Sequence, residues 1–218
     1  TMPAGPITGV VIANELLDNL PFRLAVWDDG WREACVVDRD GRALEILQPF
    51  DAVPAYLPKS GVPLGARAPI QEEAAAWTAG ALERLEAGRL LVFDYCAGVT
   101  AALAMSPWRQ WLRTYRDNQR GGHYLLEPGS QDITVEVCID QLAARAGEPD
   151  SIRSQAQWLQ FHGLDELVEE GRAIWEAGKH APGLAEMTGR SRVREAEALT
   201  DPNGLGSFTV LEWVVGPR

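Results

Sequence analysis

The 218-residue sequence predicts an α/β fold with parallel strand pairing. Two short apolar runs, at residues 8–13 and 90–95, have the composition of strands that are buried on both faces of a parallel sheet. Between them, residues 70–87 repeat apolar side chains at helical spacing. A helix that leads directly into a buried strand, with another buried strand upstream, indicates parallel pairing.

A β-hairpin insertion is expected between the first strand and this helix. Asp29 and Gly30 stand between two strand-like runs, and Asp-Gly in such a place is the strongest short-range hairpin signal. The next run, residues 41–48, predicts a third strand. Residues 49–69 are rich in Pro and Gly and predict a crossing loop.

The helix over residues 70–87 has clear signals at both ends. Glu72 and Glu73 suit the positively polarised first turn, and Gly88 is expected to cap the C-terminus. Further helices and a closing strand are expected later in the chain. The helices are predicted at residues 140–146, 151–163, 165–178 and 192–198, and the strand at residues 207–215.

These elements predict one domain over residues 1–218. Residues 1–104 and 201–218 form its sheet portion, and residues 105–200 form a mostly helical insertion that caps the sheet before the last strand.

The composition of the chain limits the classes of function and partner that we expect. The net charge of −11 repels a phosphate backbone, so we expect no nucleic-acid partner, whereas a cationic substrate would be attracted. No apolar run approaches membrane-spanning length and the first residues do not resemble a signal peptide, so we expect a cytoplasmic protein without a membrane partner. Three widely spaced cysteines and three histidines without ligand spacing predict no metal site.

Acidic residues follow both apolar strands, where ligands bind in open α/β sheets. Asn14 and Glu15 follow the first strand, and Asp94 and Tyr95 end the second. Glu15 and Asp18 are three residues apart, so a helical turn would place them on one face. On composition alone a second interpretation stays open, in which Asn14 caps the turn and the acids merely favour its N-terminus.

The segment GVVIANELLDNLP, residues 9–21, resembles the Asn-Glu-x-x-Asp-x-x-Pro signature of the MidA-type methyltransferases, which depend on S-adenosylmethionine (SAM). Cys96 departs from the family pattern, which has Gly there. Further similar segments follow in the family's order. They are GWRE (30–33), LLVFDYCAG (90–98), LLEPGSQDITVEV (125–137), SQAQWLQFHGL (154–164) and NGLGSFTVLEW (203–213).

The resemblance implies a partial Rossmann-like class I methyltransferase sheet, present from its fourth strand onward, with the β-hairpin insertion and a helical cap before the last strand. It also implies SAM as methyl donor. The family includes a mitochondrial enzyme needed for complex I assembly, and this implies a protein arginine as acceptor.

The family's glycine-rich turn and ribose-binding acid have no counterpart in the sequence. We therefore expect a chain that lacks its N-terminal cofactor-binding half and is inactive alone. The strand at residues 9–13 would then pair with that missing segment, with a partner or with a second copy.

Site residues are assigned from the resemblance and from the strand ends. Glu15 and Asp18 are expected to be catalytic, because a carboxylate can orient a guanidinium through paired hydrogen bonds. Asn14 is expected on the cofactor side. The residues expected to bind substrate are Asp94, Tyr95, Asp132 and Thr134.

Two other functions remain open. One is a non-catalytic binding or assembly module that kept the fold. The other is a regulatory half that needs a separate N-terminal partner. The nucleotide sequence upstream of Thr1 separates them: a glycine-rich strand-turn-helix in frame indicates a methyltransferase, and a start codon at Met2 favours the alternatives.

Overall fold

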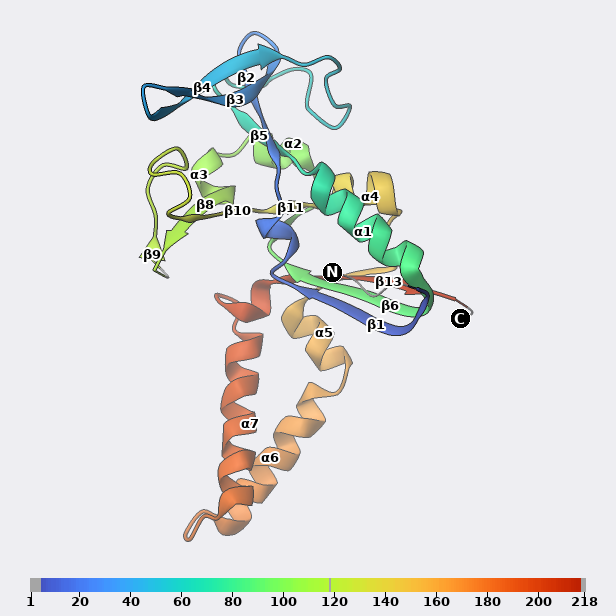
Figure 1. Cartoon of the computed structure of the whole chain (residues 1–218). Helices are drawn as coiled ribbons and strands as arrows, with labels where there is room; N and C mark the ends of the chain where they lie inside the picture. Colours follow the sequence, from blue (N-terminus) through green and yellow to red (C-terminus); the bar gives the residue numbers. More distant parts are fainter. Residues whose placement is uncertain (1–4, 118, 217–218) are drawn as a thin grey trace.

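The computed structural model describes residues 5–117 and 119–216. Its main sheet has four strands in the order β1-β6-β13-β12 (Figure 1). The first two strands pair in parallel and the other neighbours are antiparallel, which confirms the α/β class and the predicted parallel pair. The strands are β1 (Ile7–Asn14), β6 (Leu85–Asp94), β12 (Ser151–Ser154) and β13 (Thr209–Val215).

Helices cover both faces of this sheet. α1 (Glu72–Arg84) and α4 (Ile139–Ala146) lie together on one face, and α5 (Gln155–Phe161) lies on the other (Figure 1). Apolar side chains from α1, α4 and the sheet form the largest core cluster, as expected for a sheet that must bury one hydrophobic face. Its fully buried members include Ala81, Leu90, Val137, Leu142 and Leu211.

The predicted cap at Gly88 is wrong. α1 ends at Arg84, and Gly88 lies inside β6, directly opposite Gly9 of β1. Its φ is +136°, and a Cβ on Gly88 would lie 1.7 Å from the Gly9 carbonyl oxygen. Glycine is therefore required here by the close approach of two parallel strands.

The hairpin insertion forms a separate antiparallel sheet in the order β4-β3-β2-β5 at one end of the molecule (Figure 1). Asp29 adopts a left-handed conformation with φ +51°, as the Asp-Gly turn predicts. The predicted crossing loop contains a fourth strand that its proline and short length concealed. The strands are β2 (Arg23–Trp27), β3 (Trp31–Arg39), β4 (Arg42–Pro49) and β5 (Arg67–Ile70).

Short strands occupy much of the segment that follows β6. β10 is an outer strand of a small sheet in the order β10-β8-β9, and β7 pairs with β11. Residues 105–200 thus contain strands as well as helices, and both α4 and β12 pack with the main sheet. The elements are β7 (Cys96–Ala97), α2 (Thr100–Ala104), α3 (Trp108–Trp111), β8 (Leu112–Arg116), β9 (Gln119–Arg120), β10 (Asp132–Val135) and β11 (Val137–Cys138).

Two long helices, α6 (Leu164–Gly178) and α7 (Leu184–Thr200), form an antiparallel hairpin that projects away from the sheet (Figure 1). α7 begins well before the predicted residue 192. Gly171 and Gly189 lie at the crossing, where a Cβ on either would come within 2.8 Å of the other's carbonyl oxygen. Within the described residues, no helix is both long and apolar enough to cross a bilayer.

β1 is one of the two outer strands of the main sheet. Its side chains alternate, so Val11 and Ala13 face the core while Val10 and Ile12 are 56% and 63% exposed. The expectation that this strand is buried on both faces is therefore wrong in this chain.

The close contact between β1 and β6 predicts how substitution of Gly88 changes stability. Gly88→Ala should lower the free energy of unfolding by more than about 3 kcal/mol, because it forces both a strained φ and a backbone clash. Gly80→Ala is the matched control. Gly80 lies within α1 with open space around its Cα, so alanine there should stabilise by about 0.5–1 kcal/mol. Urea unfolding of both variants measures the difference, and equal stabilities would contradict the assigned register.

Candidate functional site

The chain makes a sharp turn where β1 ends. Glu15 has a φ of +47°, and its backbone N–H donates a hydrogen bond of 2.9 Å to the carbonyl of Phe93. A left-handed backbone conformation is costly for residues other than glycine and asparagine. Where such residues adopt it, they are concentrated at functional sites. The next residues form a single 3-10 turn, η1 (Leu17–Asn19), which carries Asp18.

Asp94 holds this turn in place. Its carboxylate is fully buried at the end of β6, where one oxygen accepts the N–H groups of Leu17 at 3.0 Å and Asp18 at 3.3 Å. The other oxygen accepts the N–H of Tyr95 at 2.9 Å. A buried carboxylate is tolerated when hydrogen bonds satisfy it, and here they tie the ends of β1 and β6 together.

A cavity of about 360 Å³ opens beside the turn. The structure brings five predicted site residues to its wall, and it places the other two elsewhere. Asn14 is exposed at the end of β1, and Asp94 lies buried behind the turn. The five predicted residues are Glu15, Asp18, Tyr95, Asp132 and Thr134.

Sequence reasoning missed two residues of this wall, Asn19 and Tyr115. Asn19 donates to the Asp18 carboxylate at 2.7 Å and to the Glu15 carbonyl at 3.2 Å. Tyr115 lies opposite Asp132 in the β8–β10 pair. The pairing of β8 with β10 was the missing information, because a cross-strand neighbour of Asp132 must share its face.

The cavity carries unbalanced negative charge. Glu15, Asp18 and Asp132 form no ion pair within residues 5–117 and 119–216. Arg113 lies over the Tyr95 ring at 5.1 Å, but its guanidinium pairs with Glu136 at 3.1 Å. The cavity can thus bind a cation through its carboxylates.

Burial changes the protonation of the two aspartates. It raises the pKa of Asp94 from 3.8 to about 7, with a further contribution from the charge of Asp18. It also raises the pKa of Asp18 to about 6, and Glu15 adds to that effect. The Tyr95 pKa is raised by burial and then by Glu15. A cation in the cavity would favour the charged form of Asp18.

The described residues do not fit the whole SAM molecule. In the main sheet, β1 leads into the 3-10 turn and β6 leads into β7, so neither parallel strand leads through a glycine-rich turn into a helix N-terminus. Asn14 offers one exposed amide at the carboxyl end of β1. Among the same residues, no cluster of three His, Cys, Asp or Glu side chains is arranged to hold a metal ion.

The raised pKa values predict how stability depends on pH. Each aspartate binds its proton more tightly in the folded than in the unfolded chain, so this pair lowers the free energy of unfolding as pH rises from about 4 to about 7. Asp18→Asn removes one carboxylate and its repulsion of Asp94. It should reduce the fall in unfolding free energy between about pH 5 and pH 8 by about 1 kcal/mol or more. Urea titrations at both values measure this, with the exposed Glu83→Gln as control, and identical pH profiles would contradict it.

Two solved structures from Burkholderia thailandensis share the fold. One is an uncharacterized protein of the ACR group, with a TM-score of 0.74 and 21% identity, covering 98% of this chain and 57% of its own. The other is described as a "likely methyl transferase" bound to S-adenosyl-homocysteine, with a TM-score of 0.73 and 22% identity, covering 96% and 54%. The chain thus spans little more than half the length of these proteins. No curated protein matches it.

A family profile gives the assignment. The family described as "Putative S-adenosyl-L-methionine-dependent methyltransferase" matches residues 1–156. The match includes β1, β6, the antiparallel hairpin sheet and every residue that lines the acidic cavity. The chain therefore belongs to this family of SAM-dependent methyltransferases.

Proposed function

We propose that this chain is of the MidA type and supplies the acceptor-binding side of a methyltransferase that modifies arginine on a protein substrate. The observation that carries the proposal is the acidic cavity. Unpaired carboxylates and two tyrosines surround a space at the carboxyl ends of two parallel strands. Ligands of open α/β sheets bind at this place.

An arginine side chain suits this wall. A guanidinium keeps its charge at any physiological pH, and its planar group of five donors matches a carboxylate bidentately. Glu15 and Asp18 would orient that plane, while Asp132 and Thr134 would contact the same side chain from β10. Tyr95 and Tyr115 complete the wall, and each ring already has an arginine over it, Arg113 at 5.1 Å and Arg120 at 5.7 Å.

The remaining predicted residues have other places in the proposal. Asn14 lies outside the acceptor cavity and at the end of β1, which suits the cofactor side. Asp94 acts as a positioning residue, because it contacts the backbone of the turn and not the cavity. The cofactor supplies the methyl group, and this chain supplies binding and orientation of the acceptor.

Glu15→Gln tests the role of the carboxylate. In a protein that also contains the cofactor-binding half, methyl transfer should fall at least about a hundredfold, the effect typical of removing one electrostatic interaction from a reaction site. Stability and SAM affinity should stay near wild type, since Glu15 is exposed and the change is isosteric. Methylation of an arginine peptide measures the rate, with Glu83→Gln as control. Full activity in Glu15→Gln would show that Glu15 has no part in the reaction and only favours the start of the turn.

We also propose that another segment covers the free edge of β1. Unpaired N–H and C=O groups on an outer strand attract further strands, and Val10 and Ile12 add an exposed apolar surface beside them. In the complete protein this segment would be the N-terminal half. In the isolated chain it would be a second copy.

The free edge predicts self-association. Ile12→Lys should shift the isolated chain toward monomer, because it places a charge on the apolar side of the outer strand. Sedimentation velocity across a concentration series measures the shift. Val53→Lys is the control, since Val53 is similarly exposed, at 52%, but lies in a loop. A wild-type monomer whose β1 amides exchange freely with solvent would contradict the proposal.

A further inference from the structure

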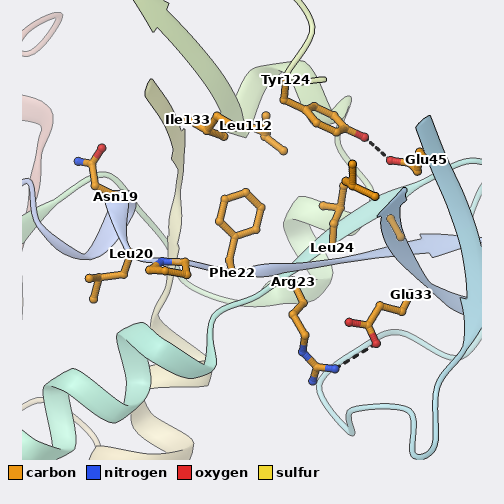
Figure 2. Close-up of a pocket in the computed structure, with 13 residues that line it drawn as sticks. Asn19, Leu20, Phe22, Arg23, Leu24, Glu33, Glu45, Leu112, Tyr124 and Ile133 are labelled. Atoms are coloured by element: carbon orange, nitrogen blue, oxygen red, sulfur yellow. Dashed lines mark hydrogen bonds and ion pairs between the residues drawn. The ribbon is translucent and has the colours of Figure 1, made fainter. Parts of the chain in front are cut away.

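A second cavity, of about 430 Å³, adjoins the acidic one. Buried Leu24 and Leu112 contribute to its wall, and the ring of Phe22 projects into the space between the hairpin sheet and β8–β10 (Figure 2). Asn19 lines both cavities. The volume lies within the range of about 300–1,000 Å³ that is usual for ligand pockets.

The polar groups at this second cavity already have partners. Arg23 pairs with Glu33 at 3.1 Å (Figure 2). Arg23 also pairs with Glu72, and Glu45 pairs with Arg67 at 2.6 Å. The hydroxyl of Tyr124 donates to Glu45. Every charged side chain that lines the space is thus in an ion pair, with Arg23 shared between two carboxylates. An apolar occupant would therefore leave these hydrogen bonds in place, whereas a charged one would compete with the existing ion pairs.

The wall of the second cavity also exposes apolar surface. Val36 is 59% exposed and Ile133 is 36% exposed, although both side chains line a concave site. Burying such surface against a ligand is favourable in proportion to the area removed from water.

β10 links the two cavities. It is an outer strand of its sheet, and its side chains alternate between faces. Asp132 and Thr134 line the acidic cavity, while Ile133 between them lines the apolar one. A polypeptide bound across this strand would therefore meet an acidic site on one side and an apolar site on the other.

We propose that the apolar cavity receives a bulky apolar side chain from the same polypeptide whose arginine enters the acidic cavity. The protein would then recognise a pair of residues, one cationic and one apolar, at a fixed separation. This inference rests on the proposed function, and it adds a sequence requirement for the acceptor.

Fluorescence anisotropy with labelled peptides tests the pair. In a series of Gly/Ser peptides, a single Phe is moved stepwise away from a single Arg. One separation should bind about tenfold more tightly than the peptide with Ala in place of Phe, the size expected for burying one large side chain. Val36→Asn should abolish this gain, and Val53→Asn should preserve it. Both substitutions are neutral and at exposed sites, so they do not alter the attraction of a cationic peptide.

The outcomes separate the two proposals. If Arg improves binding but Phe does not, or if the Phe gain survives in both Val36→Asn and Ile133→Asn, the apolar site is overturned and the proposed function stands. If neither replacing the peptide's Arg by Gln nor the Glu15→Gln substitution changes the peptide affinity, the proposed function fails. The pairing of the two cavities then fails with it. If Val36→Asn instead dissociates a dimer in sedimentation velocity, a second copy occupies the cavity and the inference is overturned.

Discussion

The buried carboxylate of Asp94 connects the sheet to everything that lies beyond its edge. It accepts N–H groups from the residues after β1 and from Tyr95 after β6, so two parallel strands end against one side chain. Without such an acceptor, the backbone of the η1 turn would lack partners in a buried place. Glu15 and Asp18 reach the cavity wall because this turn is tight, and Tyr95 reaches it because its own N–H is held by the same group. The position of the acidic cavity therefore depends on an aspartate that does not line it.

Much of the fold could be predicted from local pattern. The two parallel strands, the Asp-Gly hairpin and the third strand carry strong periodic or turn signals, and each forms. β6, however, begins at Leu85, inside the end of the predicted helix and ahead of the predicted strand at residues 90–95. The predictions fail at positions where contacts between distant segments determine the local structure. Gly88 was assigned to a helix end because glycine is common there, but its role follows from facing Gly9 across a strand pair. The short strand β5 exists because β2 offers it an edge, and four residues with a proline give no signal of that.

The candidate site shows the same division. Glu15, Asp18 and Tyr95 follow strand ends, so the rule for open α/β sheets was enough to select them. Asp132 and Thr134 came from the family resemblance, and neither composition nor spacing would have joined them to Glu15. Tyr115 was missed because nothing local marks it; only its pairing with Asp132 does. Asp94 was expected to bind substrate because it lies at the end of a strand. In the structure its side chain is buried behind the turn, so it supports the cavity without lining it, and the sequence alone does not indicate this burial.

The paired glycines between α6 and α7 have a mechanical consequence. Gly171 and Gly189 allow the two backbones to touch, so the helices can approach each other most closely at this crossing and can tilt about it. α6 has 15 residues and extends for about 22 Å. Gly171 lies in the middle of α6, about 10 Å from its end at Gly178, so a change of about 10° in tilt about the crossing would move that end by about 2 Å. The orientation of this arm, which lies on the opposite side of the main sheet from α1 (Figure 1), is thus set by two positions where a hydrogen atom takes the place of a side chain.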